Sequence, residues 1–225
     1  MKLGRLAGAI AALEYAPMEQ YLYFGSLGLH ERQYQIPNFI GLALEPAHDR
    51  EIRHDLTAAL PFATGSIAKV QAQDVLEHLP FDKAPFVLDE IYRVLKPGGT
   101  FRLSVPDYRS PPLKRRSLYD ARGRVIGDLL MGATSYLDET TGDARIRFSE
   151  NGDAHLWFPR YELVTHLILK SELRKAQIHF YQAFLDDHTY LCEPVPGDEM
   201  FVQRAAPHDR RAGGAPVSIV ANVGK

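Results

Sequence analysis

The 225-residue sequence has little cysteine, with Cys192 as its single thiol. One cysteine excludes an internal disulfide and a cysteine-rich zinc site, and it favours a reducing compartment. Long apolar runs are also missing, because no stretch reaches the roughly 20 apolar residues that span a bilayer. We therefore expect a cytoplasmic protein that has no membrane as a partner.

An excess of one charge is absent as well. Lys and Arg number 26 and Asp and Glu number 28, which leaves a formal net charge of −2. This balance gives no reason to expect nucleic acid as a partner. Hydrophobic residues make up 45% and charged residues 24% of the chain, which is ordinary for a globular protein large enough for one sizeable domain.

The first residues carry a short apolar run over 6–13, preceded by Lys2 and Arg5. A secretory signal peptide and an amphipathic helix both fit such a run. The helical spacing of its leucines and Ile10 favours an amphipathic first helix.

Strand-like and helix-like patterns alternate along most of the chain. Strand patterns lie in 20–25, 38–46, 100–107, 175–184 and 215–225, and short ones open the stretches 51–62 and 66–79. Helical patterns lie in 74–79, 82–99 and 160–173. This alternation predicts an α/β fold whose sheet is mainly parallel, with helices on both faces.

Two polar stretches interrupt the alternation. Residues 107–155 are polar and rich in turn formers, and we interpret them as an insertion or lid that contains one helix over 118–133. The link over 193–214 joins the last two strands, and its polar letters predict an exposed segment.

Ligands of such sheets bind beyond the carboxyl ends of the strands, so the residues that follow strands are candidates for a site. A glycine turn with Gly25 and Gly28 follows the first strand. Glu45 follows the second strand, where it can either bind a ribose diol or remain a solvated loop acid. Asp55 follows the third and suits an adenine amino group, but it could equally cap a turn or pair with Arg53.

The stretch over 54–107 resembles class I S-adenosylmethionine-dependent methyltransferases. The segments "DVLEHL" and "EIYRVLKPGGTFRLSVPD" carry the resemblance most clearly. It implies one Rossmann-like domain over 1–225 with a seven-stranded, mainly parallel sheet. The implied strand order is 3-2-1-4-5-7-6, closed by a C-terminal antiparallel hairpin.

The same resemblance implies S-adenosylmethionine as the cofactor and methyl transfer to a small molecule or saccharide. The cofactor-binding positions it implies are Gly25, Ser26, Gly28, Glu45, Asp55, Leu56 and Gln73. Asp74 and His155 are the candidate catalytic residues, whereas His78 is interpreted as a support for its helix. Metal ligands are not expected, because the spacing along the chain offers no set, and a homo-oligomer is left open.

Leu27 departs from the glycine pattern of the family loop. If Leu27 takes the place of the loop's second glycine, its side chain crowds the methionine end of the cofactor; if Gly28 takes over, Leu27 points into the core. The first case, which we slightly favour, suits an alternative function as a non-catalytic partner subunit or scaffold. We still place a methyltransferase first, and a nicotinamide enzyme last because no G-x-G-x-x-G is present.

Overall fold

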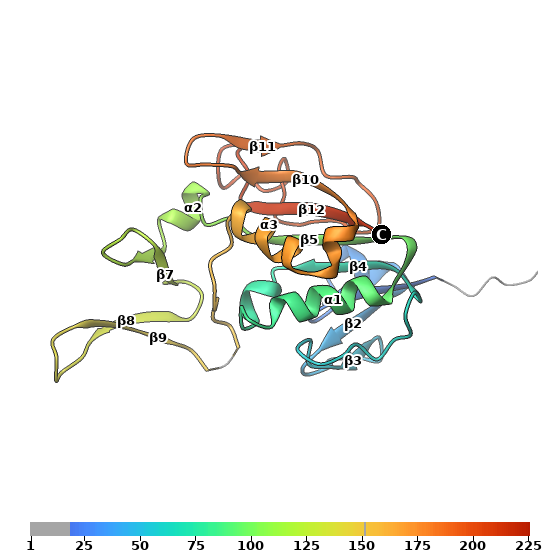
Figure 1. Ribbon diagram of the computed structural model, residues 1–225, viewed down its shortest axis with the longest axis horizontal. Helices are drawn as coiled ribbons and strands as arrows, with labels where there is room; N and C mark the ends of the chain where they lie inside the picture. The colour runs from blue at the N-terminus through green and yellow to red at the C-terminus, as the bar shows by residue number, and fades with distance from the viewer. Residues whose placement is uncertain (1–18, 151) are drawn as a thin grey trace, which may run out of the picture.

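A central sheet of eight strands organises the computed structural model, which describes residues 19–150 and 152–225 (Figure 1). Its order is β11-β10-β12-β5-β4-β1-β2-β3. The strands are β1 (Gln20–Phe24), β2 (Phe39–Ala43), β3 (Glu51–Arg53), β4 (Ile67–Gln73), β5 (Leu95–Pro106), β10 (Gln177–Phe184), β11 (Tyr190–Cys192) and β12 (Ser218–Gly224). The amphipathic helix expected near the N-terminus lies outside the described residues.

The predicted order of the seven expected strands is confirmed, with β10 and β12 as the sixth and seventh of them. β3, β2, β1, β4 and β5 pair in parallel, and β12 runs antiparallel between β5 and β10. The sheet has one strand more than expected, because β11 pairs antiparallel with β10 at the sheet edge. Asp186 makes that hairpin possible by accepting hydrogen bonds from the backbone N–H groups of His188 and Thr189 in the turn.

Two α-helices, α1 (Ala84–Val94) and α3 (Tyr161–Lys170), contact each other on one face of the sheet (Figure 1). Pro85 sits in the first turn of α1, where its missing N–H costs nothing, and Val87 and Ile91 turn toward the sheet. The remaining helical elements are short: α2 (Pro111–Lys114) and the 3-10 turns η1 (Arg32–Gln35), η2 (Leu76–His78) and η3 (Glu172–Lys175).

The opposite face has a different cover, so the expectation of helices on both faces is wrong for the described residues. Strand β1 alternates, with Leu22 in the core under the helices and Tyr21 in a second cluster on the other side. That second cluster includes Phe39 and Met200, and Tyr34 of η1 packs against it. A 3-10 turn and the 193–214 link thus stand where helices were expected.

The prediction that the 193–214 link is exposed is wrong in its middle part, where Met200 and Val202 are buried. Its polar groups find partners on the sheet. The fully buried guanidinium of Arg102 in β5 binds the Asp198 carboxylate at 2.6 Å and the backbone carbonyl of Met200. Because a buried charge needs such partners, Arg102 fixes the link across the sheet.

The 107–155 segment contains two β-hairpins that extend away from the main sheet (Figure 1). The first consists of β6 (Ser117–Tyr119) and β7 (Val125–Asp128), and the second of β8 (Ala133–Leu137) and β9 (Ala144–Phe148). The helix predicted over 118–133 is therefore wrong. Asp120 accepts two backbone N–H groups within a turn that Gly123 completes at φ +73°, and this local turn chemistry overrides the helical spacing.

In the part of the chain that the structure covers, every helix is too short or too polar to cross a membrane.

The two ends of the 107–155 segment differ in how firmly they are held. Near its start Tyr108 and Leu113 pack with Val217, whereas Tyr136 and Leu137 of the outer hairpin are exposed. We predict that amides of β8 and β9 exchange with solvent deuterium at close to unprotected rates, because their opening exposes little apolar surface. Amides around Tyr108 should exchange far more slowly. Equal protection of both regions in a hydrogen-exchange experiment would contradict this gradient.

Candidate functional site

A cavity of about 330 Å³ lies at the carboxyl ends of β1, β2 and β4. It brings together six of the nine residues predicted for the site: Gly25, Ser26, Glu45, Asp55, Leu56 and Asp74. Apolar side chains of Leu42, Val75 and Leu79 complete its wall. The cavity therefore joins carboxylates to an apolar surface, as a nucleoside site requires.

A second hollow of about 340 Å³ adjoins the cavity. The two share Gly25, Ser26, Asp74 and Val75. The second hollow is more polar, and it adds Gln73, Glu31, Gln203 and Arg204. Gln73 thus lies beside the main cavity, and Gly28 lines neither space.

Gly25 forms the sharp turn between the two hollows. Its φ is +88°, a conformation that side chains strain, and a Cβ there would meet Val75 at 3.3 Å. Its N–H donates to the carbonyl of Leu42, which ties the end of β1 to β2. Glycine is therefore required at this point of the loop.

Leu27 points away from both hollows. It is fully buried and packs with Tyr23 and Phe39 beneath the loop. Gly41 in β2 provides the space, because a Cβ there would lie 3.0 Å from that of Leu27. The expectation that Leu27 crowds the ligand is wrong; its side chain is part of the core, as in the alternative case.

The loop after β1 continues into the 3-10 turn η1, and the described residues contain no α-helix between β1 and β2. A ligand here would accordingly meet backbone and side chains of the loop. It would not meet the N-terminus of an α-helix, which is the usual phosphate or carboxylate contact in such folds.

Glu51, at the start of β3, holds two loops of the site. One carboxylate oxygen accepts from the Ser26 hydroxyl at 2.8 Å and the Leu27 N–H at 2.6 Å, and the other accepts from the Ala47 N–H at 2.6 Å. Burial raises the pKa of Glu51, but these hydrogen bonds outweigh it and leave the pKa below its ordinary value. The sequence analysis missed Glu51, because nothing in "HDREIR" distinguishes it from a surface acid.

Asp74 occupies the point where the two hollows meet. It is the one non-glycine residue with positive φ, 53°, in the described part of the chain. One carboxylate oxygen lies 3.2 Å from the Arg204 guanidinium, and the other is buried without a hydrogen-bond partner. Burial raises the pKa of Asp74, with Arg204 acting against it. Backbone strain and an unpartnered buried oxygen are typical of functional sites.

The two loop acids are placed differently. Asp55 is exposed, and its Oδ1 accepts from the backbone N–H and the hydroxyl of Thr57 at 2.8 and 2.7 Å. These hydrogen bonds lower the pKa of Asp55 and show that it caps a turn, one of the two roles that its sequence position allowed. Its Oδ2 and the exposed carboxylate of Glu45 are left to meet a ligand.

His155 does not line the cavity and is 1% exposed. Its Nδ1 lies 2.6 Å from the Tyr108 hydroxyl, and its ring packs edge to face on His78. Burial is the main cause that lowers the pKa of His155 to about 3, and the neighbouring His78 ring contributes further. This enclosure does not support the predicted role of His155 as a base in contact with substrate.

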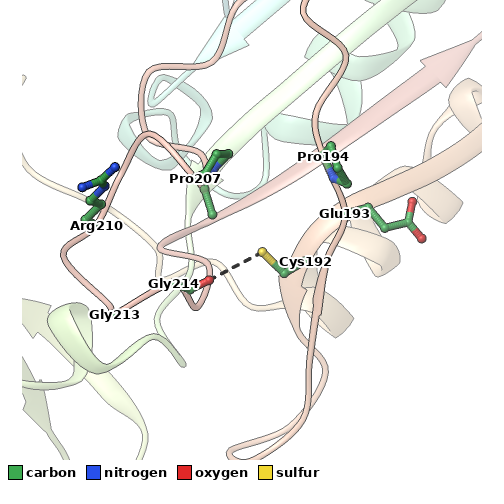
Figure 2. Close-up of a pocket in the computed structure, with 8 residues that line it drawn as sticks. Cys192, Glu193, Pro194, Pro207, Arg210, Gly213 and Gly214 are labelled. Carbon is green, nitrogen blue, oxygen red and sulfur yellow. Dashed lines mark hydrogen bonds between the residues drawn. The ribbon is translucent and has the colours of Figure 1, made fainter.

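A larger cavity of about 550 Å³ lies elsewhere, between Cys192 and the 206–214 part of the link (Figure 2). Burial raises the pKa of the Cys192 thiol, which disfavours the reactive thiolate. Its sulfur faces the carbonyl of Gly214 at 3.7 Å. Polar groups converge much less here than at Asp74, so the carboxyl-end cavity is the stronger candidate for a functional site.

In open α/β sheets, a cavity at the carboxyl ends of the parallel strands is the usual place for a nucleotide-type ligand. A family model described as a methyltransferase domain matches residues 35–103. A probable S-adenosylmethionine-dependent methyltransferase of Mycolicibacterium smegmatis is 35% identical over 98 residues, which make up 41% of this chain and 37% of that protein. The match thus spans well under half of that relative.

Among solved structures, an S-adenosylmethionine-dependent methyltransferase of Mesorhizobium loti shares the fold. It superposes with a TM-score of 0.50 at 17% identity and covers 92% of this chain and 91% of its own. Over residues 35–103 the chain thus resembles S-adenosylmethionine-dependent methyltransferases, and it shares the overall fold of one of them.

We predict that Leu27→Ala lowers the free energy of unfolding by about 2–5 kcal/mol, as other large-to-small changes in packed cores do. Affinity for S-adenosylhomocysteine should not increase, because the side chain lies outside the cavity. Urea unfolding and calorimetric titration of this variant test both parts. Tighter binding with unchanged stability would instead place Leu27 in the ligand's space.

We also predict that Glu51→Gln costs about 2 kcal/mol of stability at neutral pH, because hydrogen bonds to a charged acceptor are lost. The pKa of Glu51 is lower in the folded chain than the unfolded value of about 4.3. Its contribution is therefore complete above that value and is lost as the pH falls through the folded pKa. Glu139→Gln, at an exposed acid, is the matched control. A stability difference that persists unchanged at pH 3 would contradict this account.

Proposed function

We propose that this protein transfers a methyl group from S-adenosylmethionine to a small molecule or saccharide. The observation that carries the proposal is the convergence of Gly25, Glu45, Asp55 and Asp74 on one cavity at the carboxyl ends of the strands. The match of residues 35–103 to a methyltransferase domain supports S-adenosylmethionine as the cofactor. The acceptor class rests on the modest size of the adjoining hollow.

The chemistry of the lining residues suggests how the cofactor would lie. Glu45 would accept hydrogen bonds from the ribose hydroxyls, and Asp55 Oδ2 would accept one from the adenine amino group. Leu56 and Val75 offer apolar surface for the adenine ring. The methionine end would then enter the second hollow, where Arg204 supplies a cation for its carboxylate.

Asp74 is the residue best placed to meet the acceptor. The bound cofactor supplies an electrophilic methyl group on a sulfonium, and the protein's task is to align the acceptor with it. Asp74 lines both hollows, and its unpartnered oxygen is suited to orienting an acceptor hydroxyl or taking its proton. Because its pKa is raised, that carboxylate is a better base than an ordinary aspartate.

The 107–155 segment is proposed as a lid on the acceptor side. Gly152, close to its end, lines the cavity together with His78. Because the outer hairpins have few buried contacts, they are the part of this segment that can most readily move toward a bound ligand.

The non-catalytic scaffold is the second candidate. The loop after β1 leads into a 3-10 turn, which removes the helix N-terminus expected near the methionine end. Burial of Leu27 weakens this alternative, because the side chain that was expected to block the cofactor is turned into the core.

The test uses two charge-directed variants and a matched control. Glu45→Ala removes the ribose acceptor. Asp55→Asn retains an oxygen for Thr57 but replaces the acceptor facing adenine by a donor. Each should weaken S-adenosylhomocysteine binding about ten-fold or more, since a hydrogen bond to a charged group contributes about 1.5–3 kcal/mol.

Asp49→Ala removes the same charge from an exposed position outside the cavity and should leave the dissociation constant unchanged. Calorimetric titration measures all three variants. Unchanged affinity in both Glu45→Ala and Asp55→Asn would remove the assigned site. If the wild type binds neither S-adenosylmethionine nor S-adenosylhomocysteine, the scaffold becomes the better account.

A further inference from the structure

We propose that Glu77, His78 and His155 bind a divalent transition-metal ion, with Zn²⁺ as the best match, and that this ion fastens the 107–155 segment to the carboxyl end of the central strand β4. Glu77 and His78 belong to η2, directly after β4. His155 ends the polar segment, 77 residues after His78. The proposed methyl transfer gives none of these three side chains a role, although His78 also lines the cofactor cavity.

The three side chains already lie close together. One candidate ligand atom from each falls within 4.8 Å of the others. Glu77 Oε1 lies 3.8 Å from His155 Nε2, and the two imidazole centroids are 4.7 Å apart. Donors around a tetrahedral zinc ion are about 3.4 Å apart, given bond lengths of about 2.0–2.2 Å. A small inward movement of side chains would complete the geometry.

The environment of Glu77 is the strongest argument for a bound cation. Its side chain is 0% exposed, and neither carboxylate oxygen has a hydrogen-bond partner. Burial raises the pKa of Glu77, and the neighbouring acid Asp74 raises it further. Even a protonated carboxyl would leave a donor and an acceptor unpaired in the interior. A cation between Glu77 and the two imidazoles removes that cost.

Hydrogen bonds around His155 orient it as a metal ligand. The Tyr108 hydroxyl donates to the Asp128 carboxylate, which can only accept. The same hydroxyl oxygen therefore accepts from Nδ1–H of His155 at 2.6 Å. This assignment leaves a lone pair on Nε2, the nitrogen facing Glu77. Such outer hydrogen bonds are the usual means of fixing metal-binding histidines.

His78 is held in the same manner. Its Nδ1 lies 3.1 Å from the carbonyl oxygen of Ala154, so that nitrogen carries the proton and the neutral ring keeps its lone pair on Nε2. Two imidazoles and one carboxylate form a ligand set typical of zinc, with a further position for solvent. Two ligands come from η2 and one from beyond the hairpins, so the ion would act as a crosslink.

The experiment uses the full chain without an affinity tag, stripped of metal by a chelator and then titrated with Zn²⁺. We expect about one Zn²⁺ per chain and a rise in the thermal unfolding midpoint, because the ion binds the folded state. Co²⁺ should give the visible absorption of a tetrahedral site with nitrogen and oxygen ligands. Failure of the wild type to bind Zn²⁺ in stoichiometric amount would overturn the proposal.

Three variants separate this site from surface binding. Glu77→Gln is an uncharged isostere that should fold without metal but lose Zn²⁺ binding and the metal-dependent shift in midpoint. Tyr108→Phe retains all ligands and should weaken binding about 10–100-fold, as loss of outer hydrogen bonds does. His179→Asn alters a surface pair with Glu193 at 2.8 Å and should bind as the wild type does. Equal Zn²⁺ affinity in Glu77→Gln and the wild type would also overturn the proposal.

Discussion

The buried carboxylate of Glu51 is the constraint on which the site depends. It gathers donors from the loop after β1 and the loop after β2, whose neighbouring residues form the cavity wall. With its N–H bound to Glu51, Leu27 is directed into the core, and Gly25 is left to make the turn beside Asp74. A single acid thereby fixes the path of the loop after β1.

The two faces of the sheet are stabilised by different physical means. Apolar packing of α1 and α3 covers one face. On the other face, buried polar pairing holds the 193–214 link in addition to the burial of Met200 and Val202. Arg102 and Gln71 are buried and have partners in that link. The same link carries Arg204 to Asp74, so the cover of the second face also completes the site.

Local patterns predicted most strands, α1 and α3, because their apolar spacing and glycine stops act within a few residues. The strand order and most of the cavity residues were predicted from the family resemblance. The misses arose where distant or turn-specific interactions decide. Asp120 and Gly123 turn a helix-like run into a hairpin, and Arg102 buries a polar link. The cluster of Glu77 with His155 had no sequence signal, since its members are far apart in the chain and meet only through the fold.

The central claim is that the acid-lined cavity receives the cofactor. A crystal structure of the chain grown with S-adenosylhomocysteine tests it most directly. The account predicts the ribose on Glu45, the adenine between Leu56 and Val75, and the homocysteine sulfur directed toward Asp74. Ligand in the cavity beside Cys192, or a carboxyl-end cavity that stays free of ligand at saturating concentration, would contradict it.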